Sequence, residues 1–137
     1  MIASSSVSGS VLKVPYYKVL SEDKDLTFSP QLFADRKIIL QTEYRQAKYE
    51  SNHISDFSFK IDDDKKLRSH FFYENNKKFN LDNFIESDFD LKIQTTSKDT
   101  YLKKNKIKSS ITNNENYLEN SAKFNFSEDN STITIET

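Results

Sequence analysis

Few side chains in this sequence of 137 residues could carry acid–base, nucleophilic or metal chemistry. It has two histidines, His53 and His70, and no cysteine, so disulfides, thiolate metal sites and cysteine nucleophiles are excluded. Neither histidine has further ligand-type residues around it at metal-binding spacing. The single glycine also excludes a glycine-rich loop that could hold phosphate.

The sequence surroundings of the carboxylates are typical of turns and solvated surfaces rather than of a catalytic site. Asp62-Asp63-Asp64 lacks the glycine and the distal glutamate of an EF-hand loop and fits a hairpin tip better. Glu86, Asp88 and Asp90 are close enough in sequence to suggest a glycosidase pair, but their polar surroundings favour a solvated face. No Ser–His–Asp set can be argued, since neither histidine has a motif around it. We therefore expect no enzyme activity, no metal and no cofactor.

The amino-acid composition further limits the class of protein to which this chain could belong. Lys and Arg number 20 against 21 Asp and Glu, so the net charge of -1 gives no electrostatic case for a nucleic-acid partner. Only 35% of the residues are apolar, against roughly 45–50% in an ordinary soluble domain. Yet 11 Phe and 7 Tyr are too many for a disordered chain. No run approaches the ~18 consecutive apolar residues of a membrane-spanning helix.

The elements that would position any site are strands. Apolar and polar residues alternate over residues 26–32, 38–49, 57–61, 67–73, 89–93, 122–126 and 132–137. A period of two places one face of each strand in an apolar environment and the other in a polar one. The short polar connections predict an all-β, antiparallel up-and-down meander of about eight strands. Residues 75–87 and 97–120 are rich in Asn, Lys and Ser, and we expect long loops there.

Two features separate this pattern from that of an ordinary soluble sandwich. Residues 37–50 can form a strand of more than ten residues, against a usual ~5–6, whereas a tilted strand that crosses a bilayer needs about 9–11. Charges also occur in mid-strand, with Glu43 near Arg45 and Asp90 near Lys92. In a sandwich they would lie on the outer face; in a transmembrane barrel they would line a wet lumen. Strand pattern alone leaves both interpretations open.

Four short motifs follow one another between residues 14 and 102. They are Val14-Pro15-Tyr16-Tyr17, Asp25-Leu26-Thr27-Phe28-Ser29-Pro30, Glu43-Tyr44-Arg45, and Ser97-Lys98-Asp99-Thr100-Tyr101-Leu102. In this order and spacing they resemble the start of the barrel in the LPS-assembly proteins of the LptD, or organic-solvent-tolerance (OstA), family. The Ser-rich stretch before Val11, with Gly9, is similar to the linker that precedes this barrel. Residues 103–137 carry only generic strand patterning.

The resemblance implies a place and a function. Residues 1–10 would be the linker from a missing periplasmic jellyroll domain, and residues 11–137 an incomplete segment of a large transmembrane β-barrel. Such barrels lie in the outer membrane of Gram-negative cells and insert lipopolysaccharide into its outer leaflet. The partners implied are lipopolysaccharide, outer-membrane lipid, the plug lipoprotein LptE and the periplasmic bridge protein LptA. Both ends of the sequence look cut, and we expect a fragment of a longer protein.

The two prolines, Pro15 and Pro30, each lie in an otherwise good strand pattern. Proline has no N–H to give to a ladder, so by position alone each would mark a strand end or a bulge. The resemblance implies a different role, in which both prolines weaken the seam where the first strand of the barrel meets the last. A weak seam could part sideways as a lateral gate and let an amphiphile leave the lumen for the leaflet.

Two further functions compete with this one. The main rival is a soluble all-β binding or adhesion module that recognises carbohydrate through its aromatic residues, and a hydrolytic β-domain is more remote. The first two differ in where the apolar face points. A barrel wall exposes its Phe and Leu side chains in a band, whereas a sandwich buries them between two sheets.

Overall fold

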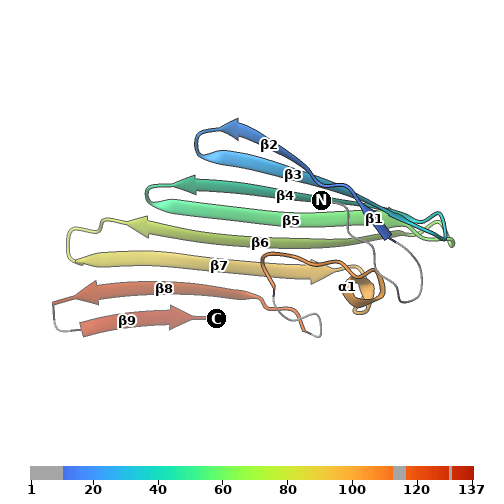
Figure 1. The fold of residues 1–137 in the computed structure, drawn as a ribbon. Coiled ribbons are helices and arrows are strands. Elements are labelled where there is room, and N and C mark those ends of the chain that lie inside the picture. The colour runs from blue at the N-terminus through green and yellow to red at the C-terminus, as the bar shows by residue number, and fades with distance from the viewer. Residues whose placement is uncertain (1–10, 113–116, 130) are drawn as a thin grey trace.

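The computed structural model describes residues 11–112, 117–129 and 131–137, which form nine strands and one helical turn (Figure 1). The strands are β1 (Val11–Lys13), β2 (Tyr16–Ser21), β3 (Lys24–Phe33), β4 (Ile38–Lys48), β5 (Ser51–Ile61), β6 (Leu67–Phe79), β7 (Glu86–Thr96), β8 (Ser121–Glu128) and β9 (Ser131–Glu136), and α1 spans Tyr101–Lys104. The predicted linker, residues 1–10, lies outside the described residues.

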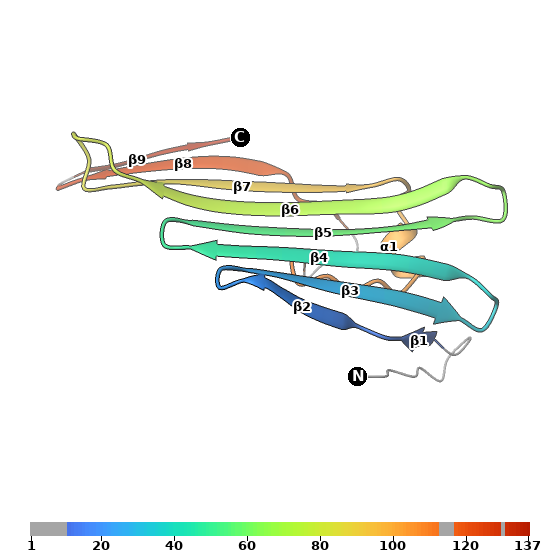
Figure 2. The ribbon, with the colours of Figure 1, turned by 90° about the horizontal axis from the view of Figure 1, so that it is seen from above.

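The strands form one antiparallel sheet in a single layer (Figures 1 and 2). From β3 onward each strand pairs with the next along the chain, and β1 and β2 both pair with β3 in the same register. The predicted all-β up-and-down meander is therefore confirmed. Within the described chain the sheet is open, and its two edges are the β1–β2 segment and β9.

The central strands are long, with 10 to 13 residues each in β3 to β7. The prediction of a loop over residues 75–87 is wrong at both ends, because β6 continues to Phe79 and β7 begins at Glu86. The polar residues there pair well across strands: Asn76 lies opposite Asp90 and donates a hydrogen bond to its carboxylate. Backbone pairing on both sides of β6 outweighs the low strand propensity of Asn and Lys.

The two faces of the sheet differ sharply in chemistry. One row across the strands, Gln41–Ser58–His70, belongs to what we call the polar face. The next row, Thr42–Phe57–Phe71, belongs to the apolar face. Because side chains alternate along each strand, the register assigns every strand residue to one of these two faces.

Burial is reversed relative to a soluble protein. Buried polar and charged side chains gather on the polar face: Gln31, Gln41, Asp56, Ser58, Lys60 and His70. Large apolar side chains are exposed across the apolar face: Leu12, Leu32, Ile38, Phe57, Phe59, Ile61, Leu67, Phe71, Phe124, Ile133 and Ile135. Exposed apolar surface of this kind marks contact sites for proteins or membranes.

Residues 97–112, which we call the strap, cover part of the polar face. The strap leaves β7, forms α1, and continues across β6 and β5 to β4, so that α1 overlaps β4 and β5 in Figure 2. The buried apolar cluster joins the two sheet residues Ile39 and Phe72 to four strap residues, Tyr101, Leu102, Ile107 and Ile111. The predicted loop over 97–120 is thus confirmed apart from one helical turn, while residues 113–116 are outside the described part of the chain. No described helix is long and apolar enough to cross a membrane.

Residues 62–66 form the predicted turn, between β5 and β6. The backbone closes with Asp62 N–H donating to Lys66 O at 3.0 Å, and Lys65 takes a left-handed φ of 58°. Lys60 Nζ lies 2.6 Å and Arg68 Nε 2.9 Å from the Asp62 carboxylate. These two hydrogen bonds, that of Lys60 first, lower the pKa of Asp62 to about 2. Asp62 therefore stabilises the turn that the sequence predicted at these aspartates.

Candidate functional site at the first edge of the sheet

The two prolines remove hydrogen bonds on different sides of the edge strand. Val14 N–H donates to Pro30 O at 3.2 Å, so the backbone polar groups of Pro30 face the β1–β2 segment. In an antiparallel ladder the N and O of one residue point to the same side, and those of the next residue to the other. The missing N–H of Pro30 therefore leaves the Val14 carbonyl without a donor from β3. The nitrogen of Pro15 faces away from β3, toward the open edge.

Neither proline needs a bulge. Pro30 lies inside β3 with regular pairing to Leu40 of β4, and Pro15 lies at the interruption between β1 and β2. The register shift in this part of the sheet lies between Val19 and Ser21 instead. The prediction from position alone, that each proline marks a strand end or a bulge, is therefore correct for Pro15, which lies at a strand end. It is wrong for Pro30, which lies inside a regular strand.

Five residues from three of the sequence motifs meet on the polar face beside this edge. Tyr17, Thr27 and Glu43 lie in one row across β2, β3 and β4, and Asp25 and Arg45 are paired in the next row. Arg45 Nε donates to Asp25 Oδ1 at 2.8 Å and lies 3.7 Å from Glu43 Oε1. We call these five residues the motif patch. Segments up to 28 positions apart in the sequence thus form one continuous charged surface.

The remaining tyrosines of these motifs face the other way. Tyr16 in β2 and Tyr44 in β4 lie on the apolar face, as their register partners Phe28 and Leu26 show. The Tyr44 hydroxyl donates to Gln46 Oε1 at 3.1 Å, at the point where the apolar residues of β4 give way to polar ones. The motifs therefore supply both faces of the edge.

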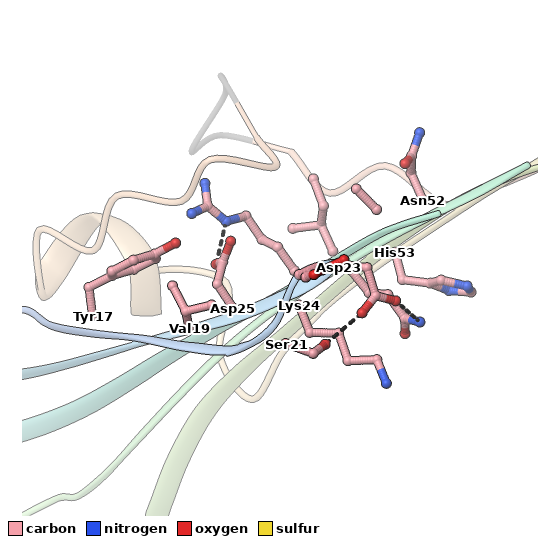
Figure 3. Close-up of a pocket in the computed structure, with 13 residues that line it drawn as sticks. Tyr17, Val19, Ser21, Asp23, Lys24, Asp25, Asn52 and His53 are labelled. Atoms are coloured by element: carbon pink, nitrogen blue, oxygen red, sulfur yellow. Dashed lines mark hydrogen bonds and ion pairs between the residues drawn. The ribbon is translucent and has the colours of Figure 1, made fainter. Parts of the chain in front are cut away.

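A groove of about 550 Å³ runs along the β2–β3 hairpin next to the motif patch (Figure 3). Tyr17, Val19 and Asp25 line it from one side and His53 from the other. At the tip of the hairpin, Ser21 Oγ donates to Asp23 Oδ1 at 2.5 Å, and this hydrogen bond lowers the pKa of the Asp23 carboxyl. The groove is shallow and mixed in charge, which suits a polar chain lying along the surface more than an enclosed small molecule.

A second groove, of about 360 Å³, lies at the proline interruption, and we call it the seam groove. Its lining includes Lys13, Pro15, Thr27, Ser29, Glu43 and Lys108. Lys108 belongs to the strap, which is held here by two hydrogen bonds: Gln41 Nε2 to Lys108 O at 3.0 Å and Ser110 Oγ to Glu43 Oε2 at 2.6 Å. The strap thus forms one wall of the cavity next to the edge strand.

The fourth motif supplies an anchor of the strap. Tyr101 is buried, and its hydroxyl lies 2.9 Å from Ser58 Oγ in β5, while burial raises the pKa of Tyr101. Asp99 lies exposed in the turn before α1. The structure therefore brings together the first three motifs and places the fourth in the strap.

One cluster was not anticipated from the sequence. Ser58 Oγ lies 2.7 Å from His70 Nδ1, and His70 Nε2 lies 3.5 Å from Asp56 Oδ1, so a hydroxyl, an imidazole and a carboxylate adjoin on the polar face. Gln41 Nε2 donates to both oxygens of Asp56 at 3.1 Å. Ser58 is buried, and its Oγ also lies 2.9 Å from the Tyr101 hydroxyl of the strap. This cluster fastens the strap to the sheet.

The described residues include no group of three or more His, Asp or Glu side chains placed to hold a metal ion. No protein-family model matches the sequence, and no curated protein matches it significantly. The likeness to LPS-assembly proteins therefore rests on the four motifs themselves.

Proposed function

We propose that this chain is a segment of an outer-membrane β-barrel that transports lipopolysaccharide and inserts it into the outer leaflet. The observation that carries the proposal is the reversal of burial. The side chains withdrawn from solvent on the sheet are mostly polar and charged, whereas Phe, Leu and Ile are exposed on the opposite face. A barrel wall has this arrangement, because its outer face contacts lipid and its inner face a wet lumen.

The course of the apolar residues across the sheet supports the same proposal. In β5 the apolar residues are Phe57, Phe59 and Ile61. In β8 the apolar residues on this face include Ala122. The row of Ala122 continues through β7 and β6 to His53 in β5, and His53 lies four residues before Phe57. The apolar band therefore runs obliquely to the strands. Strands that tilt in a membrane produce such a band, because the lipid boundary cuts each successive strand at a shifted position.

Two tyrosines border this band as an amphipathic girdle would. Tyr44 is the last aromatic residue on the apolar face of β4, and the residues that follow Tyr44 and Tyr73 on that face are polar, although an aromatic residue returns in β6 at Phe79. The Tyr73 hydroxyl lies 2.8 Å from His53 Nδ1, and the Tyr44 hydroxyl bonds Gln46. Each ring thus has an apolar body and a hydrogen-bonded tip, which suits the boundary between acyl chains and headgroups.

In this proposal the edge strand is the exit. An amphiphile in the lumen has to move its acyl chains to the lipid side without exposing them to water. The β1–β2 segment is held to β3 by a ladder that lacks the Pro30 donor, and Pro15 presents no donor to a strand beyond it. The last strand of a closed barrel would pair there, so both sides of the edge strand are weakened. The partners LptE and LptA belong to the proposal through the resemblance alone.

The rival function, a soluble carbohydrate-binding module, is not favoured by the same observation. Such a module would bury its Phe and Leu side chains between two layers. In the described part of the chain the sheet is a single layer, and the strap covers the polar face rather than the apolar one.

Adjacent residues on opposite faces allow a direct test. A photoreactive phenylalanine analogue at Thr27 would face the lumen, whereas one at Phe28 would face lipid. In cells that carry the protein in its native membrane, we expect Thr27 to form lipopolysaccharide adducts that disappear when lipopolysaccharide synthesis is inhibited. Adducts of Phe28 with bulk lipid should persist. Recovery of the protein in a soluble fraction, or no lipopolysaccharide adduct at Thr27, would refute the proposal.

The prolines give a second prediction. Pro30→Ala restores a donor toward Val14 O, and one added backbone hydrogen bond is worth about 0.5–1.5 kcal/mol. Pro15→Ala restores a donor toward the seam. We expect the double variant to slow amide hydrogen exchange over residues 11–21 and to reduce lipopolysaccharide delivery to the cell surface. Thr42→Ala in β4 restores no donor and is the control. Unchanged exchange and delivery in the double variant would mean that the prolines do not soften a gate.

A further inference from the structure

The charged side chains of the sheet are divided unequally between its two faces. In β2 to β7 the register assigns every Asp and Glu to the polar face: Asp25, Glu43, Asp56, Glu74, Glu86, Asp88 and Asp90. On the apolar face of the same strands, the Asp, Glu, Lys and Arg residues are lysines alone: Lys18, Lys24, Lys48 and Lys77. We call these four residues the lysine border. A face that carries basic groups and no carboxylate is complementary to an anionic partner.

The lysine border follows one side of the apolar band. Lys18 lies in the same row as Tyr44, the last aromatic residue on the apolar face of β4. Lys24 lies one row further, and Lys48 and Lys77 lie in the row after that. From β2 to β6 the lysines therefore shift toward the hairpin tips, in the same sense as the oblique band. These tips, of β2–β3, β4–β5 and β6–β7, lie at the end of the sheet opposite to α1 (Figure 1).

Basic residues on the polar face already have partners within the chain. Arg45 Nε lies 2.8 Å from Asp25 Oδ1, and Lys92 Nζ lies 3.2 Å from Glu74 Oε1. Among the described residues, by contrast, no ion pair includes a member of the lysine border. Three of its four members are exposed, and the fourth, Lys24, is partly buried. The charge of the lysine border is therefore available to a partner outside the chain.

The apolar band beside the lysines decides which anionic partner fits. A lysine can lay its methylene stem along apolar surface and keep its ammonium group at the polar boundary. In a bilayer the headgroup phosphates lie at that boundary, next to the acyl chains that would cover the band. Basic residues close to a membrane surface are attracted to anionic lipids in this way. An acidic protein segment would match the charge, but it would leave the apolar band uncovered.

We infer that the lysine border binds the headgroup phosphates of anionic lipids that surround the wall, and so fixes the depth of this part of the sheet in the bilayer. The inference rests on the proposed function. It adds a lipid partner on the outside of the wall, which stays around the protein rather than passing through it.

Partitioning of the detergent-solubilised protein into lipid vesicles tests the inference. Vesicles of phosphatidylcholine alone are compared by flotation with vesicles that also contain phosphatidylglycerol, which is anionic. We expect stronger partitioning into the anionic vesicles, and we expect added salt to reduce this preference. One lysine near an anionic surface contributes about fivefold to partitioning, so Lys48→Gln and Lys77→Gln should each lower the preference about fivefold.

The chain offers a matched control in the next residue. Lys78 follows Lys77 in β6 but lies on the polar face, opposite Asp88. Lys78→Gln removes the same charge from the chain and should leave the preference for anionic vesicles unchanged. Lys77→Glu should lower the preference further than Lys77→Gln does. Unchanged partitioning of each variant into neutral vesicles shows that it still folds.

The possible failures are distinguishable. Equal partitioning of the unaltered protein into both kinds of vesicle would overturn the inference and leave the proposed function standing, and the lysines would then suit an acidic protein surface instead. Equal losses in the Lys77→Gln and Lys78→Gln variants would overturn it too, because net charge alone would account for the preference. Recovery of the unaltered protein outside both kinds of vesicle would overturn the proposed function itself.

Discussion

Phe72→Ala is expected to destabilise the protein by about 3–5 kcal/mol, the usual cost of removing a fully buried aromatic side chain. Phe72 is 0% exposed on the polar face and packs in the cluster of strap residues. Its ring also lies 4.6 Å from that of His70, centroid to centroid. The substitution therefore opens a cavity beneath the strap. Thermal or urea unfolding of the protein in detergent micelles measures the loss.

The neighbouring residue is the control. Phe71 has the same side chain in the same strand, but it lies on the apolar face and is 43% exposed. If the apolar face contacts lipid as proposed, the ring of Phe71 meets apolar tails in the folded and the unfolded state alike, so Phe71→Ala should cost less than about 1 kcal/mol. A two-layer sandwich would give the opposite order. If Phe71→Ala proves the more damaging change, the apolar face is the buried one and the barrel-wall interpretation fails.

Strand positions and faces were largely predictable because they depend on local alternation. The strand over 38–49, for example, appears as β4, with Leu40 and Tyr44 on one face and Gln41 and Arg45 on the other. The end of β6 was missed because Asn75 to Lys78 have low strand propensity. Their pairing is set by β5 and β7, which lie elsewhere in the sequence.

The course of the strap over the sheet was missed for a different reason. A segment without periodicity reads as a loop, and its course over the sheet depends on contacts with distant strands. A signal was nevertheless present, since Ile39 and Phe72 interrupt the alternation by placing large apolar side chains on the polar face. Phe33 and Ile54 do the same and pack against the same cluster. Apolar residues out of phase in a strand can thus mark where a separate segment covers a sheet.

The candidate site was predictable only in part. Glu43 and Arg45 were expected on one polar face, and they lie there together with Asp25. Lys108 could not be assigned to this site, because the turns of the strap alone decide that it reaches the edge strand. The Ser58–His70 contact was also not predicted. The register between two strands brings these residues together, and no local sequence motif indicates the contact.

In the proposed barrel, Phe59→Arg is expected to destabilise the membrane-inserted protein by about 2–4 kcal/mol, the cost of a basic side chain on the lipid face near the middle of a bilayer. Phe59 is the central one of the three apolar residues on this face of β5, between Phe57 and Ile61, and is 41% exposed. Ile61→Arg lies on the same face at the end of β5, where the side chain can reach the interface, and should cost only about 0–1 kcal/mol. Denaturant titration of folding into phospholipid vesicles measures both. A soluble module has no bilayer depth, so equal effects at the two positions, or a Phe59→Arg variant that folds as well as the unaltered protein in water without lipid, would show that the apolar face does not contact a membrane.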